Sequence, residues 1–475
     1  MLRNSRYCLL ATAVLAAALP AQQPAADAGR FLGNWMGTLV TPAARLRLAL
    51  TVTRDSSGKL AGALTSLDQG NFKIPAVVTT HGDTLIATMA SVQASYSAVI
   101  SAAGDSLRGT FTQGMPLPLA MGRVAALPMP ARPQEPKPPF PYRTEDVNFV
   151  SVPGVRLAGT ISIPRGAGPF PAVVMVTGSG AQNRDEELLG HKPFLVIADY
   201  LARHGIASLR YDDRGFAGST GKFAAATSAD FANDAQAAVA FLRKQPGIAA
   251  NRVGILGHSE GGLVAPIVAA RDPDVAFIVL LAGPGVPGDS ILLMQEELIA
   301  KAAGAPQAAI DTNIAVNERL FAAVKAARDS ADAVARVNAI VDRMVASVPA
   351  DEQASARARL DAAAKQVLSP WMRYFLSYDP RPTLRRVHVP VLALDGSLDL
   401  QVPPHQDLAA IDTALKQGGN RDYRVELLPG LNHLFQPAKT GSPSEYASIE
   451  ETFSPAALAI IADWINAHAG KPVRK

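Results

Sequence analysis

Beyond residue 142, short apolar runs rich in β-branched residues alternate with longer segments of helical periodicity. Strands that are apolar on both faces and joined by helices form parallel sheets that are covered on both sides. The pattern therefore predicts an α/β fold with a doubly wound, mostly parallel sheet over residues 143–475. The predicted strands are residues 172–176, 206–210, 253–256, 277–281, 391–394 and 425–428. The predicted helices are residues 194–203, 230–244, 262–271, 405–416 and 455–468.

One connection in this series is much longer than the others. Between Gly283 and Pro390 the chain is rich in Ala, Gln, Arg and Lys, with helical spacing at residues 291–303 and 310–327. A long insertion with its own helices, placed late in a sheet, is typical of a cap over the carboxyl ends of the strands. We expect this helical cap at about residues 288–378.

Residues 30–125 follow a two-residue period instead. Along residues 45–52 apolar side chains alternate with arginine and threonine, which suits a strand buried on one face. Turn sequences rich in Gly, Asn and Asp recur at short intervals. We expect a small all-β accessory domain, sandwich or barrel, without catalytic residues. Seven prolines between residues 128 and 141 then predict a semi-rigid linker at residues 126–142.

The first 21 residues have the organisation of a secretory signal peptide. Arg3 and Arg6 precede an apolar run at residues 7–19, which is too short to span a bilayer. We therefore expect an exported protein, periplasmic or secreted, without a stable membrane span after cleavage. The only cysteine, Cys8, lies in this segment, so the mature chain would have no thiol for disulfides, metal binding or catalysis. A net charge of +4 over 475 residues gives no indication of nucleic-acid binding.

A nucleophile is predicted where the run at residues 253–256 leads directly into Gly-His-Ser-Glu-Gly at residues 257–261. The bare motif is common by chance, but its position between a strand and a helix is specific. Glycines on both sides let strand and helix approach closely, so the serine lies on a tight turn with its hydroxyl exposed. Ser259 is the predicted nucleophile.

A serine hydroxyl needs a base to take its proton, and the base needs an acid to fix its tautomer. In this kind of fold the partners follow in the order Ser, Asp, His. His433, in the loop before the final predicted helix, is the predicted base. Asp399, in the loop after residues 391–394, is the predicted acid. Asp395 is the alternative, but at the strand end it is better placed to cap the turn.

Acyl transfer also requires two backbone N–H groups directed at the developing oxyanion. One is predicted at Glu260, and the other at Ser179, in the small-residue loop after the first long strand of the sheet. Gly180 beside it is expected to contact the substrate. An ordinary glycine turn is the alternative, whereas a phosphate-binding loop would require a Gly-Lys-Ser/Thr continuation.

Several charged residues lie in loops after neighbouring predicted strands. Two roles are open for them: pairing with one another to brace the mouth of the site, or direct contact with the substrate. Carboxylates flanked by arginines, without a histidine cluster, do not suit a divalent cation, so no metal is expected. The residues are Arg184, Asp185, Glu186, Asp212, Asp213 and Arg214.

These motifs resemble those of bacterial α/β-hydrolases of the esterase, serine aminopeptidase-like and bile-acid-CoA thioesterase-like groups. The resemblance covers about residue 142 to the C-terminus. It rests on Thr-Gly-Ser-Gly at 177–180 with Arg-Asp-Glu at 184–186, Arg-Tyr-Asp-Asp-Arg-Gly at 210–215, the Ser259 motif, and the contexts of Asp399 and His433. It implies carboxylic ester hydrolysis through an acyl-enzyme, without a cofactor. These groups commonly carry histidine where this chain has Thr177. The resemblance therefore does not indicate which contacts support the loop at residues 177–180.

The same catalytic residues would also cleave amides and thioesters. A serine peptidase or aminopeptidase and an acyl-CoA thioesterase are therefore alternative functions, and a non-catalytic binding protein is a further one. The predicted substrate is a small-molecule ester of short acyl chain, because bulky apolar residues at 371–376 in the cap would enclose a short pocket. Trp371 is predicted to line it, the alternative being that these aromatics form the cap's own core. The sequence does not indicate an oligomeric state.

Overall fold

The computed structural model describes residues 28–41, 45–67, 73–128 and 131–468. The predicted signal peptide at residues 1–21, with Cys8, lies outside the described residues. The chain forms two compact units, Met1–Pro128 and Met129–Lys475. Within the described ranges, no helix has both the length and the apolar composition needed to cross a membrane.

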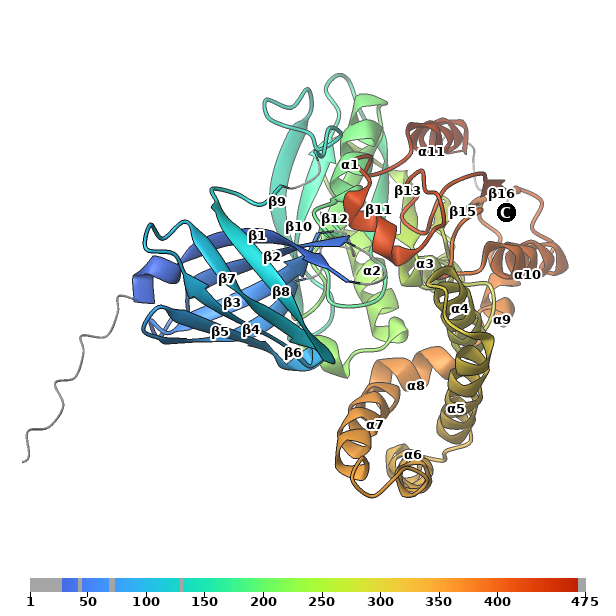
Figure 1. Cartoon of the computed structure of the whole chain (residues 1–475). Helices are drawn as coiled ribbons and strands as arrows, with labels where there is room; N and C mark the ends of the chain where they lie inside the picture. The colour runs from blue at the N-terminus through green and yellow to red at the C-terminus, as the bar shows by residue number, and fades with distance from the viewer. Residues whose placement is uncertain (1–27, 42–44, 68–72, 129–130, 469–475) are drawn as a thin grey trace, which may run out of the picture. The chain divides into compact units, whose positions relative to one another are not determined.

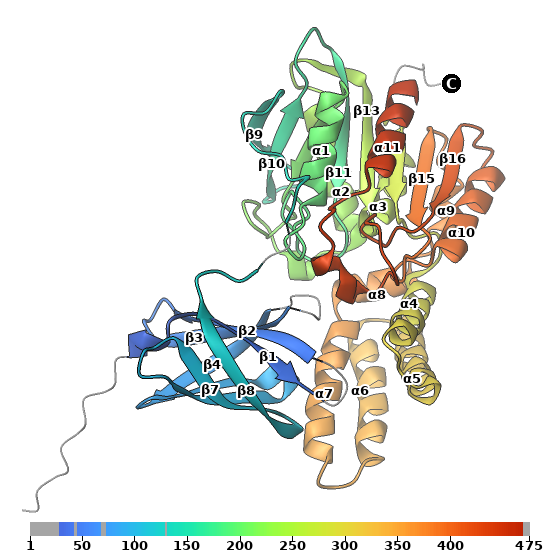
Figure 2. The same cartoon turned by 45° about the horizontal axis from the view of Figure 1, so that its top comes forward.

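The first unit is a closed antiparallel barrel in which each strand pairs with the next and β8 returns to β1 (Figures 1 and 2). The predicted all-β accessory domain is thus confirmed, as a barrel. Its strands are β1 (Gly33–Val40), β2 (Arg45–Arg54), β3 (Leu60–Ser66), β4 (Lys73–His81), β5 (Thr84–Met89), β6 (Ala94–Ile100), β7 (Ser106–Gln113) and β8 (Met115–Val124), with short 3-10 helices at Ala28–Phe31 and Ala90–Val92.

The barrel interior is a packed core. Along β6, buried and exposed residues alternate, as the two-residue period of a strand with one inward face requires. Trp35 and Tyr96 are fully buried, and each satisfies its polar atom on the backbone: Trp35 Nε1 donates to the carbonyl of Phe31 at 2.9 Å, and the Tyr96 hydroxyl to that of Leu119 at 3.1 Å. Large side chains therefore fill the interior, as in other small barrels.

The second unit contains an eight-stranded sheet of order β16-β15-β14-β13-β11-β12-β10-β9. The strands from β11 to β16 run parallel, while β9 and β10 are antiparallel to their neighbours. This is the predicted α/β-hydrolase fold, which is confirmed, although β9 and β10 were not predicted. The strands are β9 (Arg143–Val150), β10 (Arg156–Ile163), β11 (Phe170–Val176), β12 (Ala207–Tyr211), β13 (Ile248–His258), β14 (Ile278–Leu281), β15 (Val391–Gly396) and β16 (Tyr423–Leu428).

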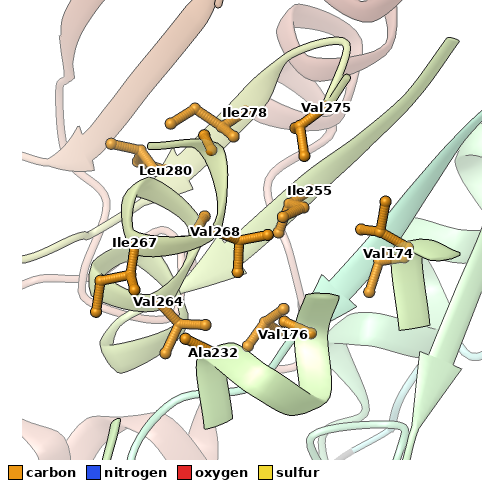
Figure 3. Close-up of a cluster of buried hydrophobic side chains, with 14 of the residues drawn as sticks. Val174, Val176, Ala232, Ile255, Val264, Ile267, Val268, Val275, Ile278 and Leu280 are labelled. Atoms are coloured by element: carbon orange, nitrogen blue, oxygen red, sulfur yellow. The ribbon is translucent and has the colours of Figure 1, made fainter. Parts of the chain in front are cut away.

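Helices cover both faces of this sheet, and each face has its own apolar core. In β11, Val174 and Val176 face one core and Val173 and Met175 face the other. Figure 3 shows the first core, where side chains of β11 and β13 meet those of α3. The first core includes residues of α2 (Ser228–Leu242), α3 (Glu260–Ala269), α9 (Arg381–Leu384) and α10 (Pro404–Gln417), and the second includes α1 (Pro193–Arg203) and α11 (Pro455–His468).

Of the six helices between β14 and β15, the first five form the predicted cap, with a small apolar core of their own (Figure 1). They are α4 (Gly288–Ala302), α5 (Gln307–Lys325), α6 (Ser330–Ala346), α7 (Gln353–Val367) and α8 (Pro370–Ser377). Short 3-10 helices also occur at Phe223–Ala225 and Pro443–Ser448.

Part of the proline-rich segment is fixed to the second unit. The Arg132 guanidinium donates hydrogen bonds to the carbonyls of Ala447 and Ile449, at 2.8 and 2.7 Å. The Gln134 side chain accepts from the backbone N–H of Thr452 at 2.6 Å. This portion of the predicted linker therefore packs on the hydrolase unit rather than acting as a free spacer.

Candidate active site

Ser259 lies between the end of β13 and the start of α3, with φ 52° and ψ −117°. A positive φ is unfavourable for a residue with a side chain and is typical of a strained nucleophile turn. Glycine is required on both sides: a Cβ on Gly257 would lie 2.0 Å from the carbonyl oxygen of Gly261, and one on Gly261 would lie 2.1 Å from that of Val176. The surrounding backbone thus fixes the conformation of Ser259.

A cavity of about 580 Å³ lies against this turn, and five of the predicted site residues line it. Its volume is within the range of small-molecule binding sites. The cap contributes most of the apolar wall, and the polar lining residues come from the loop after β11, the turn itself, the cap and the loop after β15. The five residues are Ser179, Gly180, Ser259, Glu260 and Trp371.

The structure brings Asp399 and His433 together from the loops after β15 and β16. His433 Nδ1 lies 2.6 Å from Asp399 Oδ2, and both side chains are buried. The second carboxylate oxygen of Asp399, Oδ1, accepts from the backbone N–H groups of Gln401 at 2.6 Å and Val402 at 3.0 Å. These bonds fix the carboxylate beside the imidazole, and a neutral His433 that donates from Nδ1 to Asp399 has an unprotonated Nε2.

Asp395, the alternative acid, is fully buried at the end of β15. Its Oδ1 accepts from the N–H of Gly396 at 2.7 Å, which is the turn-capping role expected for it. Burial, together with the charge of Asp399, raises the pKa of Asp395 well above its usual value. Within the described part of the chain, Asp395 Oδ2 has no hydrogen-bond partner, so no donor there stabilises an ionised form of this carboxyl.

The predicted oxyanion loop passes directly beside Ser259. A Cβ built on Gly178 would lie 3.2 Å from the Cβ of Ser259. The Gly178 N–H is already used, since it donates to Glu186 Oε1 at 2.8 Å. Of the two amides in Gly178-Ser179, the one at Gly178 is therefore the one that binds Glu186.

The loop at residues 177–182 is supported by Asp213, a contact that the sequence resemblance did not indicate. The Thr177 hydroxyl donates to Asp213 Oδ1 at 2.9 Å, and the N–H of Gln182 donates to Oδ2 at 2.8 Å. Burial raises the pKa of Asp213 to about 8, although both hydrogen bonds act to lower it. A threonine-carboxyl contact thus holds this loop.

The other charged loop residues pair among themselves or with α2. Arg184 Nη2 lies 2.8 Å from Asp212 Oδ2, and Arg210 pairs with Asp185. Arg214 instead binds Asp234 on α2, with Nε 2.6 Å from Oδ2. These pairs brace the loops around the site. Among the described residues, no group of three or more His, Cys, Asp or Glu side chains is arranged to hold a metal ion.

The side chain of Glu260 has a role that the sequence did not suggest. Its Oε1 accepts from the Ser228 hydroxyl at 2.6 Å and from Trp371 Nε1 at 2.7 Å. Burial raises the pKa of Glu260 to about 7, although these two hydrogen bonds lower it. Trp371 belongs to cap helix α8 and stacks on Phe375 at 5.1 Å. The residue after the nucleophile is thereby tied to the wall of the cap.

Comparison with known proteins places the chain among hydrolases. The model of the X-Pro dipeptidyl-peptidase (S15) family matches residues 153–428. Esterase EstD of Thermotoga maritima is 27% identical over 310 residues, which are 65% of this chain and 64% of EstD, so less than two thirds of that relative is spanned.

Two solved structures align with this chain at low sequence identity. The α/β-hydrolase GrgF from Penicillium sp. sh18 is 16% identical with a TM-score of 0.44, covering 69% of this chain and 100% of GrgF. Esterase Pf2001 of Pyrococcus furiosus is 14% identical with a TM-score of 0.42, covering 73% of this chain and 100% of Pf2001.

Proposed function

The chain belongs to the X-Pro dipeptidyl-peptidase (S15) family of hydrolases, and on this premise we propose that it cleaves small carboxylic esters through Ser259, His433 and Asp399. The observation that carries the proposal is the buried Asp399–His433 pair, 2.6 Å apart, in the loops that follow β15 and β16. In an α/β-hydrolase sheet, these loops carry the acid and the base for the serine at the end of β13.

In the proposed mechanism, Ser259 Oγ attacks the ester carbonyl while His433 Nε2 takes the hydroxyl proton. The N–H groups of Glu260 and Ser179 stabilise the oxyanion. Collapse of the tetrahedral intermediate breaks the bond to the alcohol, which leaves with the proton from His433. Water, deprotonated by His433, then attacks the acyl-enzyme, and the carboxylic acid is released as Ser259 regains its proton.

The cavity favours an ester over a peptide with a free amino terminus. A dipeptidyl-peptidase needs a group to hold the terminal ammonium. The carboxylate in the wall, Glu260, already accepts two hydrogen bonds and has a raised pKa, which makes it a poor partner for a cation. The other polar side chains from the cap and from the loop after β15 are uncharged: the amides of Gln295, Gln366 and Gln401 and the hydroxyl of Ser369.

A peptidase activity is the second candidate, because the family is named for it. The esterase and peptidase activities are distinguished by comparing kcat/KM of the purified protein for p-nitrophenyl butyrate and for Gly-Pro-p-nitroanilide. The proposal predicts a much higher kcat/KM for the ester. A higher kcat/KM for the anilide would make the protein a peptidase with the same catalytic residues, and a preference for acyl-CoA in the same assay would make it a thioesterase.

Short acyl chains are the proposed substrates, and Trp371 is proposed to set the limit. Acetyl and butyryl p-nitrophenyl esters should be hydrolysed faster than palmitoyl esters, because the acyl and alcohol groups share one cavity of about 580 Å³ under the cap. Trp371→Ala should extend the accepted chain length by removing part of the wall. The measurement is kcat/KM across the acyl series.

Trp371→Phe is the matched control, since it keeps an aromatic wall but loses the N–H that binds Glu260. It should leave the chain-length preference near that of the wild type. If both variants keep the wild-type preference, or if emulsified long-chain triglycerides are the best substrates, then the enclosed-pocket proposal fails and Trp371 serves the core of the cap.

Export is also part of the proposal. It is supported by the charges of Arg3 and Arg6 ahead of the apolar run at residues 7–19. Fractionation of a bacterial host that expresses the whole chain, with mass measurement of the mature N-terminus, tests it. Recovery of the uncleaved chain from the cytosol would count against export.

A further inference from the structure

His258, directly before the nucleophile, has a hydrogen-bond acceptor at each ring nitrogen. Its Nδ1 lies 2.9 Å from Glu186 Oε1, and its Nε2 lies 3.0 Å from the carbonyl oxygen of His433. The ring is 6% exposed and its centroid is 4.9 Å from that of His433. An imidazole that faces two acceptors is satisfied only when both nitrogens carry hydrogen, so His258 is an imidazolium.

Glu186 completes this arrangement from the other side. It is 3% exposed, and the same oxygen that faces His258 also accepts from the Gly178 N–H at 2.8 Å. Its backbone has φ 52°, a conformation that costs free energy for a residue with a side chain and persists only where surrounding contacts hold it. One carboxylate oxygen thus joins the oxyanion loop to the turn that carries Ser259.

We propose that Glu186 and His258 are positioning residues that align the oxyanion loop and the His433 loop with Ser259. The inference rests on the proposed function, because it assigns these residues to the same site. Neither side chain is given a role in bond breaking. Each acts through a backbone group: Glu186 through the amide of Gly178, and His258 through the carbonyl of the base.

The reason for this assignment is that catalysis requires these three segments to be closely aligned. Oxyanion donors must lie within about 3 Å of the developing charge, and a displacement of about 1 Å can cost about 100-fold in rate. A buried ion pair contributes little net stability compared with apolar packing of the same volume, so stability alone does not account for it. Here the pair spans three segments that are far apart in sequence.

The charge of His258 makes this alignment depend on pH. Burial acts to lower the pKa of His258, but the charge and hydrogen bond of Glu186, the His433 carbonyl and the charge of Asp399 together raise it. The groups that act on the His258 ring are therefore the carboxylates of Glu186 and Asp399 and the backbone carbonyl of His433. Because the folded-state pKa of His258 is raised, the Glu186–His258 pair contributes its full stabilisation at pH values below the ordinary histidine range. This stabilisation is lost as the pH rises through the raised pKa.

Glu186→Gln tests the proposal with p-nitrophenyl butyrate as the probe. The amide keeps the size of the side chain but removes the charge that holds the second proton on His258. We expect kcat to fall 10- to 100-fold with little change in KM, and the alkaline limb of the kcat profile to move to lower pH. A purely structural role would lower the melting temperature without moving that limb.

Glu187→Gln is the matched control, since Glu187 is exposed and its hydrogen bonds within the described part of the chain are with Asn183 rather than with Gly178 or His258. It should leave kcat and the pH profile unchanged. His258→Gln should lose a similar factor in kcat, and the double variant with Glu186→Gln should lose no more than the worse single variant, because the two act as one unit.

The results separate this inference from the proposed function. If the wild-type protein hydrolyses no ester, the proposed function fails. If the wild type is active but folded Glu186→Gln keeps the wild-type kcat and alkaline limb, or if the two substitutions are additive, the positioning role alone is wrong. Should Glu186→Gln not fold, His258→Gln is judged by the same readouts, and failure of both to fold would mean that the pair serves the fold instead.

Discussion

Ser259→Ala is expected to lower kcat for ester hydrolysis by about 10⁶-fold, to the background set by the binding groups that remain. The loss is that large because removal of the nucleophile stops acyl-enzyme formation altogether. The fold should be preserved. The turn is shaped by close backbone contacts at Gly257 and Gly261, and alanine tolerates the φ of 52° about as well as serine does.

The measurement is turnover of p-nitrophenyl butyrate, with the melting temperature as a check on folding. Ser355→Ala, at an exposed position on cap helix α7, is the control and should behave as the wild type. Turnover of Ser259→Ala within tenfold of the wild type would place the nucleophile elsewhere.

Asp399→Asn is expected to lower kcat by about 10⁴-fold, as loss of the orienting acid does in other triads. The hydrogen bonds around Asp399 explain why. Oδ1 accepts from the N–H groups of Gln401 and Val402, so the asparagine carbonyl must take that position and its amide must face His433 Nδ1. The imidazole would then carry its proton on Nε2, where it can no longer accept one from Ser259.

Asp395→Asn provides the comparison. Burial and the charge of Asp399 raise the pKa of Asp395 well above its usual value, which favours an uncharged group at this position, and the asparagine amide is close to isosteric with the carboxyl. We expect kcat to change by less than about tenfold. Steady-state kinetics of both variants decide between the two carboxyls, and the opposite pattern would make Asp395 the orienting acid.

The sequence predicted the parallel strands β11 to β15 because nearly all their residues are buried and most of these strands appear as continuous apolar runs. It did not reveal β9 and β10, which are antiparallel strands at one edge of the sheet. In β9 all but two of the eight residues are exposed, so hydrophobicity gives little signal there. Cap helices α6 and α7 were likewise not delimited, since their apolar faces pack only on one another and on the rest of the cap.

The candidate triad could be predicted because a strand, a tight turn and the order of residues along the chain constrain it locally. The supporting contacts could not. Glu186 and His258 are 72 residues apart, and Thr177 and Asp213 are 36 residues apart. The sequence placed these groups in loops near the site, but partner choice among several nearby charges depends on side-chain geometry. The bond between Glu260 and Trp371 joins the turn to the cap and gave no pattern to detect.

The central claim is that Ser259 is an activated nucleophile, and covalent labelling tests it most directly. The purified protein is treated with a fluorophosphonate, digested, and the modified peptide is identified by mass. The account predicts a single adduct on Ser259, with no adduct in the Ser259→Ala variant. An adduct on another residue, or none on a preparation that hydrolyses p-nitrophenyl butyrate, would contradict it.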